Sequence, residues 1–198
     1  LMMAGIEYLM NGTLLAYDAE HLLAAATLSN VILTFIYIPL DGLDTGIQPL
    51  MSRLFAANKK QHCLRVMRYG FCLTMLLTFL FYVPLLIFTE EIATVFVEEG
   101  EPVTEEMIMF LRLSFALQPF VGVYTWLSGI MAALEDEWRN VVVNLTPLFV
   151  QTPLIILLPK ILPPEWIAFS YSVQDFAEAM VAFLLIRSFL KSNGISFK

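Results

Sequence analysis

Residues 69–88 read YGFCLTMLLTFLFYVPLLIF, twenty consecutive residues without a charged side chain. A helix of this length extends about 30 Å, which matches the thickness of the hydrocarbon core of a bilayer. Residues 22–40, 113–134 and 140–159 also carry no charge, and residues 166–186 contain only Asp175 and Glu178. The sequence therefore predicts a chain that crosses a membrane several times.

The composition supports this prediction. Hydrophobic residues make up 59% of the 198 residues, the mean hydropathy is +0.75, and only 15% of the residues are charged. Soluble domains have roughly 45–50% apolar and about 25% charged residues, so a soluble fold of this size could not bury so much apolar surface. The net charge of −7 reflects one acidic segment, and nucleic acid is not expected as a partner.

We predict an all-α fold, a polytopic membrane helical bundle of about six transmembrane helices that form a single lobe. The predicted spans are residues 1–16, 22–52, 69–88, 107–134, 140–159 and 166–190. The first span would reach only about 24 Å, so we expect that truncation of the chain has removed its initial turn or two. The sequence begins at Leu1 and shows no recognisable signal peptide, which indicates a longer chain upstream.

The loop charges predict the orientation of the spans. Residues 53–68 hold five Lys and Arg residues without an acid, whereas residues 89–106 hold seven Glu residues without a Lys or Arg. Basic residues near span ends stay in the cytoplasm. Residues 53–68 should therefore face the cytoplasm, together with Arg139, Arg187, Lys191 and Lys198, and both termini should be cytoplasmic.

Several motifs carry a family resemblance. Residues 38–50 read IPLDGLDTGIQPL, and Ala56-Ala57-Asn58 follow. This stretch resembles the Gly-x-Gln-Pro segment and the small-residue turn of the multidrug and toxic compound extrusion (MATE) transporters. Later stretches are similar to further motifs of this family: Leu111-Arg112-Leu113 through Gln118-Pro119-Phe120-Val121-Gly122, Ala132-Ala133-Leu134-Glu135-Asp136, and Trp166-x-Ala168 with Asp175. The departures are Ala56 and Glu135, where the family usually has Gly, and the added charges of Asp41 and Asp44.

The resemblance implies a fold and a function. Full transporters of this family look like two six-helix lobes, and a helix with a Glu, which Glu7 matches, often opens the second lobe. The chain would then be the C-terminal half of a cation-coupled efflux antiporter for amphipathic organic compounds, in the bacterial inner (plasma) membrane. Its partners would be the lipid bilayer, a small organic substrate, and the missing N-terminal lobe or a second copy.

Ionisable side chains at membrane depth are the candidate cation-binding residues, because an isolated charge there costs about 2.5–3.5 kcal/mol. Glu7 and Asn11 are one helical turn apart and could bind H⁺ or Na⁺ together. Asp175 and Glu178 share a face in the middle of the last span, with Gln174 adjacent, and two carboxylates there should not both ionise. Solvation near the surface is the alternative for Glu7, and packing by interhelical hydrogen bonds is the alternative for Asp175.

Uncharged polar residues mark the candidate substrate path. These residues are Gln48, Asn144, Gln151 and Gln174. Interhelical hydrogen bonding is an adequate alternative for them, and Asn144 and Gln151, seven residues apart, should share a face. Asp41 and Asp44 are expected near the inner boundary of their span, where solvation explains them.

The sequence favours no enzymatic activity. It has no Gly-x-Ser-x-Gly or Walker sequence and no metal-ligand spacing, so we expect no catalytic residues and no cofactor apart from the coupling ion, H⁺ or Na⁺. An ion gradient would supply the energy. The alternatives are a lipid-linked oligosaccharide flippase, whose cavity should hold more Arg and Lys, and a non-transporting membrane half-protein.

Overall fold

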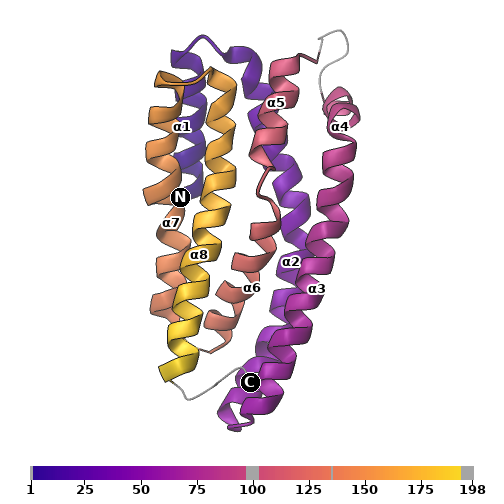
Figure 1. Ribbon diagram of the computed structural model, residues 1–198, viewed down its shortest axis with the longest axis vertical. Coiled ribbons are helices and arrows are strands. Elements are labelled where there is room, and N and C mark those ends of the chain that lie inside the picture. Colours follow the sequence, from indigo (N-terminus) through magenta and orange to yellow (C-terminus); the bar gives the residue numbers. More distant parts are fainter. Residues whose placement is uncertain (1, 97–102, 135, 193–198) are drawn as a thin grey trace.

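The computed structural model describes residues 2–96, 103–134 and 136–192, and these residues form helices without a strand. The long helices run side by side along the length of the molecule, whereas α1 accompanies only its upper part (Figure 1). The helices are α1 (Met2–Ala16), α2 (Leu23–Ala56), α3 (Lys60–Ile87), α4 (Thr89–Phe96), α5 (Glu105–Ser114), α6 (Pro119–Ala133), α7 (Glu137–Leu157) and α8 (Phe169–Ser192). Short 3₁₀ turns lie at Glu20–Leu22, Leu158–Lys160 and Pro164–Ala168.

Helix α6 is central in the packing, since it contacts α2, α3, α7 and α8. Small residues permit this proximity. A Cβ atom at Gly70 of α3 would collide with the ring of Trp126 on α6, and one at Gly122 of α6 would collide with the hydroxyl group of Thr78 on α3. Close approach at glycine is the usual way for membrane helices to gain van der Waals contact, because lipid leaves little hydrophobic drive between them.

Apolar side chains cover much of the outside of the lobe. Leu76 and Leu80 on α3, Phe35 on α2 and Phe149 on α7 are each more than 60% exposed. In the described part of the chain, four helical segments are long and apolar enough to cross a membrane: Glu20–Ala56, Lys60–Ile87, Glu105–Ala133 and Glu137–Lys160. The chain is therefore a helical membrane protein. Neither α1, with 15 residues, nor α8, with its acidic pair, is among the four, so six spans stay a prediction.

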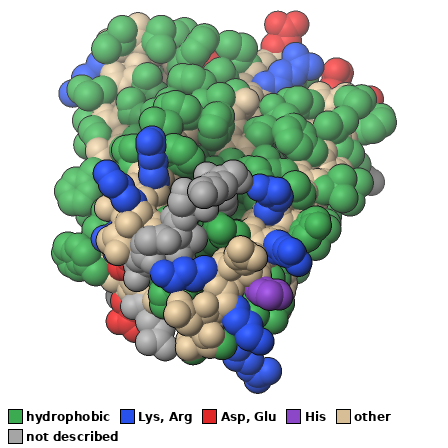
Figure 2. Space-filling view, turned by 60° about the horizontal axis from the view of Figure 1, so that its bottom comes forward, with side chains coloured by type: hydrophobic (Ala, Val, Ile, Leu, Met, Phe, Trp, Pro, Cys, Tyr) green, Lys and Arg blue, Asp and Glu red, His purple; other side chains and the backbone are tan. Residues whose placement is uncertain are grey.

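The charged side chains separate toward the two ends. The end of α2, the start of α3, the start of α7 and the end of α8 meet at one end, and Figure 2 brings this end forward and shows Lys and Arg side chains gathered around it. Glu90 and Glu91 on α4 and Glu105 and Glu106 on α5 lie at the opposite end. This separation agrees with the loop charges, while the orientation in the membrane and the position of the termini stay predictions.

Both predicted loops contain more helix than expected. The basic stretch 53–68 is helical except for a tight turn at residues 57–59, where Asn58 adopts φ 53°. Asn tolerates this left-handed conformation because its short side chain can bond locally. The acidic stretch 89–106 includes α4 and the first residues of α5, and residues 97–102 lie outside the described residues, as do Glu135 and Lys198.

The predicted span 107–134 is interrupted. Helix α5 ends at Ser114 and α6 begins at Pro119, the first-turn position in which proline costs no backbone hydrogen bond. Ser172 of α8 satisfies the interrupted backbone. Its single O–H is shared between the carbonyl oxygens of Leu113 (2.7 Å) and Ser114 (3.1 Å), and its oxygen accepts a hydrogen bond from the N–H of Leu117 (3.1 Å). A break at membrane depth is tolerated only where such partners replace the lost bonds.

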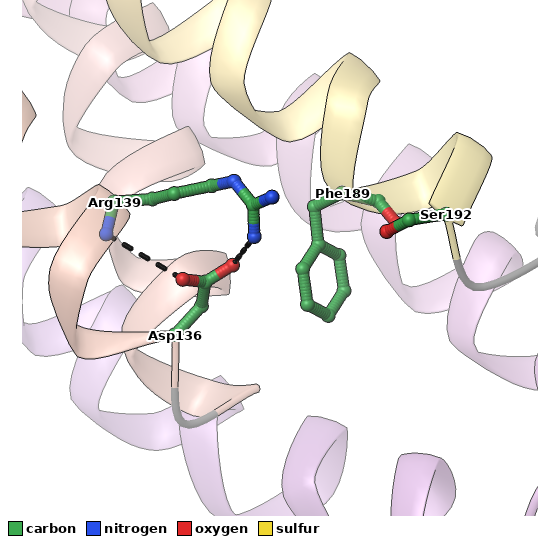
Figure 3. Close-up of polar contacts among 4 residues, drawn as sticks. All are labelled: Asp136, Arg139, Phe189 and Ser192. Carbon is green, nitrogen blue, oxygen red and sulfur yellow. Dashed lines mark hydrogen bonds and ion pairs between the residues drawn. The ribbon is translucent and has the colours of Figure 1, made fainter.

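The start of α7 is fixed to the end of α8 at the basic end of the lobe (Figure 3). Asp136 caps α7 by accepting from the backbone N–H of Arg139, and its carboxylate also pairs with the Arg139 guanidinium. The same guanidinium lies 5.6 Å from the ring centroid of Phe189 on α8. Arg139, predicted to be cytoplasmic, therefore also links two helices.

Candidate functional site

One face of α2 is polar along most of its length. The residues on this face follow one another at spacings of four and three, which place them on a single stripe of a helix. They are Asn30, Thr34, Tyr37, Asp41, Asp44 and Gln48. This stripe lies on the side of α2 that meets α6, because Tyr37 hydrogen-bonds to Tyr124 of α6 and the Asp44 carboxylate lies against Gly129 of α6.

Helix α8 presents a second polar face toward the interior. Asp175 and Glu178 are each only 4% exposed, and Gln174, also 4% exposed, donates to Glu178 from Nε2 at 3.1 Å. Tyr171 precedes Asp175 by one turn on the same side of the helix. The sequence prediction that Asp175 and Glu178 share a face is confirmed, and both carboxylates are buried.

A polar cavity of about 320 Å³ lies toward the basic end of the lobe. Asp44 accepts a hydrogen bond from Gln48 at 2.8 Å inside it, and Asn144 donates to the carbonyl (2.8 Å) and side-chain (3.0 Å) oxygens of Asn140. Asn140 also bonds to Ser128 of α6. The cavity is lined by Tyr37, Asp41, Asp44, Gln48, Tyr124, Thr125, Ser128, Gly129, Ala132, Asn140 and Asn144.

Tyr37 and Tyr124 form the wall between this cavity and the acidic pair of α8. Their hydroxyl groups are hydrogen-bonded to each other, and both side chains line the cavity. Each tyrosine is also close enough to Asp175 and Glu178 to interact with both electrostatically. Asp175 and Glu178 themselves do not line the cavity. The tyrosine pair is therefore the contact between an open polar space and two buried carboxylates.

Glu7 has a different partner from the predicted one. Its Oε1 accepts a hydrogen bond from Nδ2 of Asn30 on α2 at 3.0 Å, and Tyr171 of α8 lies close to both residues. Asn11 is half-buried and forms no hydrogen bond with Glu7 in the described chain. Glu7 itself is exposed. The structure thus joins α1, α2 and α8 around the Glu7 carboxylate.

The candidate substrate-path residues have different environments. Gln48 and Asn144 line the cavity, and Gln174 lies beside Glu178, whereas Gln151 is 1% exposed and its amide finds no partner among the described residues. Asn144 and Gln151 both lie on α7, and they differ in burial, because Asn144 is exposed whereas Gln151 is buried. The hydrogen bonds that Gln48, Asn144 and Gln174 form with other described residues are within their own helices.

Asp41 and Asp44, both expected to be solvated, have different environments. Solvation fits Asp41, which is exposed, but Asp44 is half-buried and bonded to Gln48. Asn30, Tyr37, Tyr124 and Tyr171 were not identified from the sequence. The heptad-like spacing of polar residues on α2 was the signal that could have revealed Asn30 and Tyr37.

Apolar membrane-crossing helices, one of them interrupted, that enclose buried carboxylates and a polar cavity are typical of multi-pass membrane transport proteins. The comparison with protein families shows to which family of transport proteins the chain belongs. The MatE family model matches residues 1–157, about four-fifths of the chain, and the chain therefore belongs to the MatE family of membrane transporters. No curated protein and no solved structure gives a significant match. The match ends at Leu157, the last residue of α7, so the assignment of Asp175 and Glu178 depends on the geometry of α8.

Proposed function

We propose that this transporter is a secondary active antiporter that exchanges H⁺ or Na⁺ for amphipathic, often cationic, organic compounds. The observation that supports the proposal best is the buried pair Asp175 and Glu178 in the middle of α8. Within the described part of the chain neither carboxylate forms an ion pair with a Lys or Arg. Carboxylates at membrane depth without a basic partner are favourable binding sites for a cation, because the cation offsets the cost of the buried charge.

Glu7 supports the same proposal as a second cation-binding residue. It receives an amide hydrogen bond from Asn30 and lies near Tyr171, which is one helical turn from Asp175. The polar faces of α2 and α8 therefore run from Glu7 toward the cavity at the basic end. Glu7, Asp175 and Glu178 would act at successive levels of one polar path, with Asn30 in place of the predicted partner Asn11.

The cavity supports an organic cation as the substrate. Asp41 and Asp44 contribute negative charge to it, and no Lys or Arg belongs to its described lining. A flippase for a lipid-linked oligosaccharide must hold a pyrophosphate, for which Arg and Lys are the usual ligands. The lining therefore favours the antiporter over the flippase. We place the chain as one lobe that works with a second lobe, in the bacterial inner (plasma) membrane.

The experiment is flux measurement on the complete protein that carries this chain, reconstituted into proteoliposomes with an imposed H⁺ or Na⁺ gradient. Asp175→Asn and Glu178→Gln should abolish gradient-driven efflux, and Glu7→Gln should weaken its dependence on the cation. Glu137→Gln is the matched control, since Glu137 is exposed at the start of α7. Unchanged coupling in both Asp175→Asn and Glu178→Gln would overturn the proposal. Translocation of a lipid-linked oligosaccharide would favour the flippase, and the absence of any flux would favour a non-transporting membrane half-protein.

A further inference from the structure

Among the described residues, Tyr37 and Tyr124 are the cavity-lining side chains that interact electrostatically with both acidic residues of α8. The hydroxyl groups of Tyr37 on α2 and Tyr124 on α6 are bonded to each other. Both rings line the cavity, and both hydroxyl groups lie within electrostatic reach of Asp175 and Glu178. A cation that passes from the cavity to these carboxylates between the two tyrosines must pass the hydroxyl pair.

A tyrosine hydroxyl group can transmit a proton but not a metal ion. Each hydroxyl group donates one hydrogen bond and accepts another, so two bonded hydroxyl groups form a short chain of exchangeable protons. A sodium ion would need the pair to separate and would need several oxygen ligands during its passage. The closed hydrogen bond between Tyr37 and Tyr124 therefore distinguishes H⁺ from Na⁺.

We propose that Tyr37 and Tyr124 form a proton relay that connects the cavity with Asp175 and Glu178, and that the coupling ion of this transporter is H⁺. In each transfer one hydroxyl oxygen accepts a proton from water in the cavity while its own proton moves to the other hydroxyl group. That second group releases its proton to a carboxylate. Both tyrosines end neutral, the carboxylate gains one proton, and both O–H bonds then turn back. The relay deepens the proposed antiport function and rests on it for its physiological purpose.

The charges around the pair are all acidic. Asp41 and Asp44 face the cavity from α2, and Asp175 and Glu178 face the pair from α8. From the neighbouring helices, α7 contributes Asn140 and Asn144 to the cavity, and α3 has no charged side chain between Tyr69 and Ile87. Negative charge on both sides of the hydroxyl pair favours a passing proton and provides an acceptor in either direction.

The relay is tested by the rate at which the buried carboxyl groups take up a proton. The complete protein in proteoliposomes is subjected to a rapid drop in pH, and the carboxyl C=O stretch is followed by time-resolved infrared spectroscopy. The variants Asp175→Asn and Glu178→Gln identify the band. Tyr37→Phe and Tyr124→Phe remove one oxygen atom each and keep the ring, and Tyr69→Phe on the 73% exposed Tyr69 of α3 is the matched control.

We expect Tyr37→Phe and Tyr124→Phe each to slow the rise of the band by roughly a hundredfold, the contribution of one positioned proton-transfer group. The final amplitude should stay the same, because the carboxylates are unchanged. Tyr69→Phe should follow the wild type. An unchanged rate in either phenylalanine variant that keeps the wild-type melting temperature would overturn the relay. Substrate transport driven by a Na⁺ gradient alone, without a pH gradient, would overturn it as well. The infrared measurement needs no transported substrate, so failed efflux with a slowed band would contradict only the antiport function.

Discussion

The hydroxyl group of Ser172 on α8 accepts a hydrogen bond at 3.1 Å from the backbone N–H of Leu117, in the turn between α5 and α6. The same hydroxyl group donates to backbone carbonyl oxygens at the end of α5. One side chain thus replaces bonds that an uninterrupted helix would have made within itself. This contact positions α6, which carries Tyr124 and Gly129, against α8, which carries Asp175 and Glu178.

Replacing Ser172 by Ala should destabilise the protein by about 1–2 kcal/mol, because the Leu117 N–H would lose its partner at membrane depth. The matched control is Ser170→Ala. Ser170 is on the same helix and fully buried, but its hydroxyl group finds no partner among the described residues. Thermal unfolding in detergent should show a lowered midpoint for the first variant and an unchanged or higher midpoint for the second. An equal decrease of the midpoint in both variants would show that the hydrogen bonds of Ser172 add no specific stability.

Gly129 should be intolerant of even one added methyl group. A Cβ atom at Gly129 would overlap the carboxylate of Asp44, whereas a Cβ atom at Gly46 of α2 would meet nothing within 4 Å. Gly129→Ala should therefore cost about 1–3 kcal/mol, while Gly46→Ala should stabilise α2 by about 0.5–1 kcal/mol. Unfolding midpoints measure both effects.

The collision can be separated from a general packing defect by a double-mutant cycle with Asp44→Ala. If Asp44 is the obstacle, Gly129→Ala should cost much less in the Asp44→Ala background than in the wild type. Costs that simply add would contradict the contact between Gly129 and Asp44.

Asn30 should matter for ion coupling in the same way as Glu7. Asn30→Ala removes the amide that donates to the Glu7 carboxylate, and a hydrogen bond to a charged group is worth about 1.5–3 kcal/mol. If Glu7 binds the coupling ion, the cation concentration for half-maximal efflux should shift about tenfold or more, since about 1.4 kcal/mol is a factor of ten. Asn11→Ala is the control and should shift it little. A larger shift in Asn11→Ala than in Asn30→Ala would instead identify Asn11 as the partner of Glu7.

The orientation in the membrane can be measured with single cysteines. In a background with Cys63→Ala and Cys72→Ala, Lys59→Cys should react with a membrane-impermeant maleimide only from the cytoplasmic side, and Glu91→Cys only from the outside. Both positions are exposed: Lys59 is the last residue of the turn between α2 and α3, and Glu91 is on α4. Labelling from the opposite sides would reverse the predicted topology.

The sequence predicted the long helices because their apolar stretches leave no other way to satisfy the backbone in lipid. It did not predict the break between α5 and α6, although Pro119 stands there, because α2, α3 and α7 also contain proline and are unbroken. The stability of the break depends on Ser172, more than fifty residues away. The partnership of Glu7 with Asn30 was missed because it also depends on a contact between helices. Side chains on different helices meet through packing, and a rule for residues within one helix selected Asn11.

The acidic residues of α8 were predicted, but their relation to the tyrosines was not. A charge inside an apolar stretch is conspicuous in a sequence, whereas a tyrosine in a membrane helix is common at the interfaces and does not stand out. Only the packing of α2 against α6 brings Tyr37 and Tyr124 together in front of Asp175. The heptad-like polar spacing on α2 could have identified a face but not the helix that it meets.

The acidic pair of α8 carries an energetic cost of its own, because both carboxylates are buried. Asp175→Asn and Glu178→Gln replace buried carboxylates by amides of the same shape and remove the repulsion between two acids within one turn of each other. Each variant should therefore unfold at the same or a higher temperature than the wild type, although gradient-driven efflux is lost. Loss of activity together with unchanged or raised stability is typical of residues kept for function. Glu137→Gln should change neither property, and strong destabilisation of both α8 variants would instead assign the pair to packing.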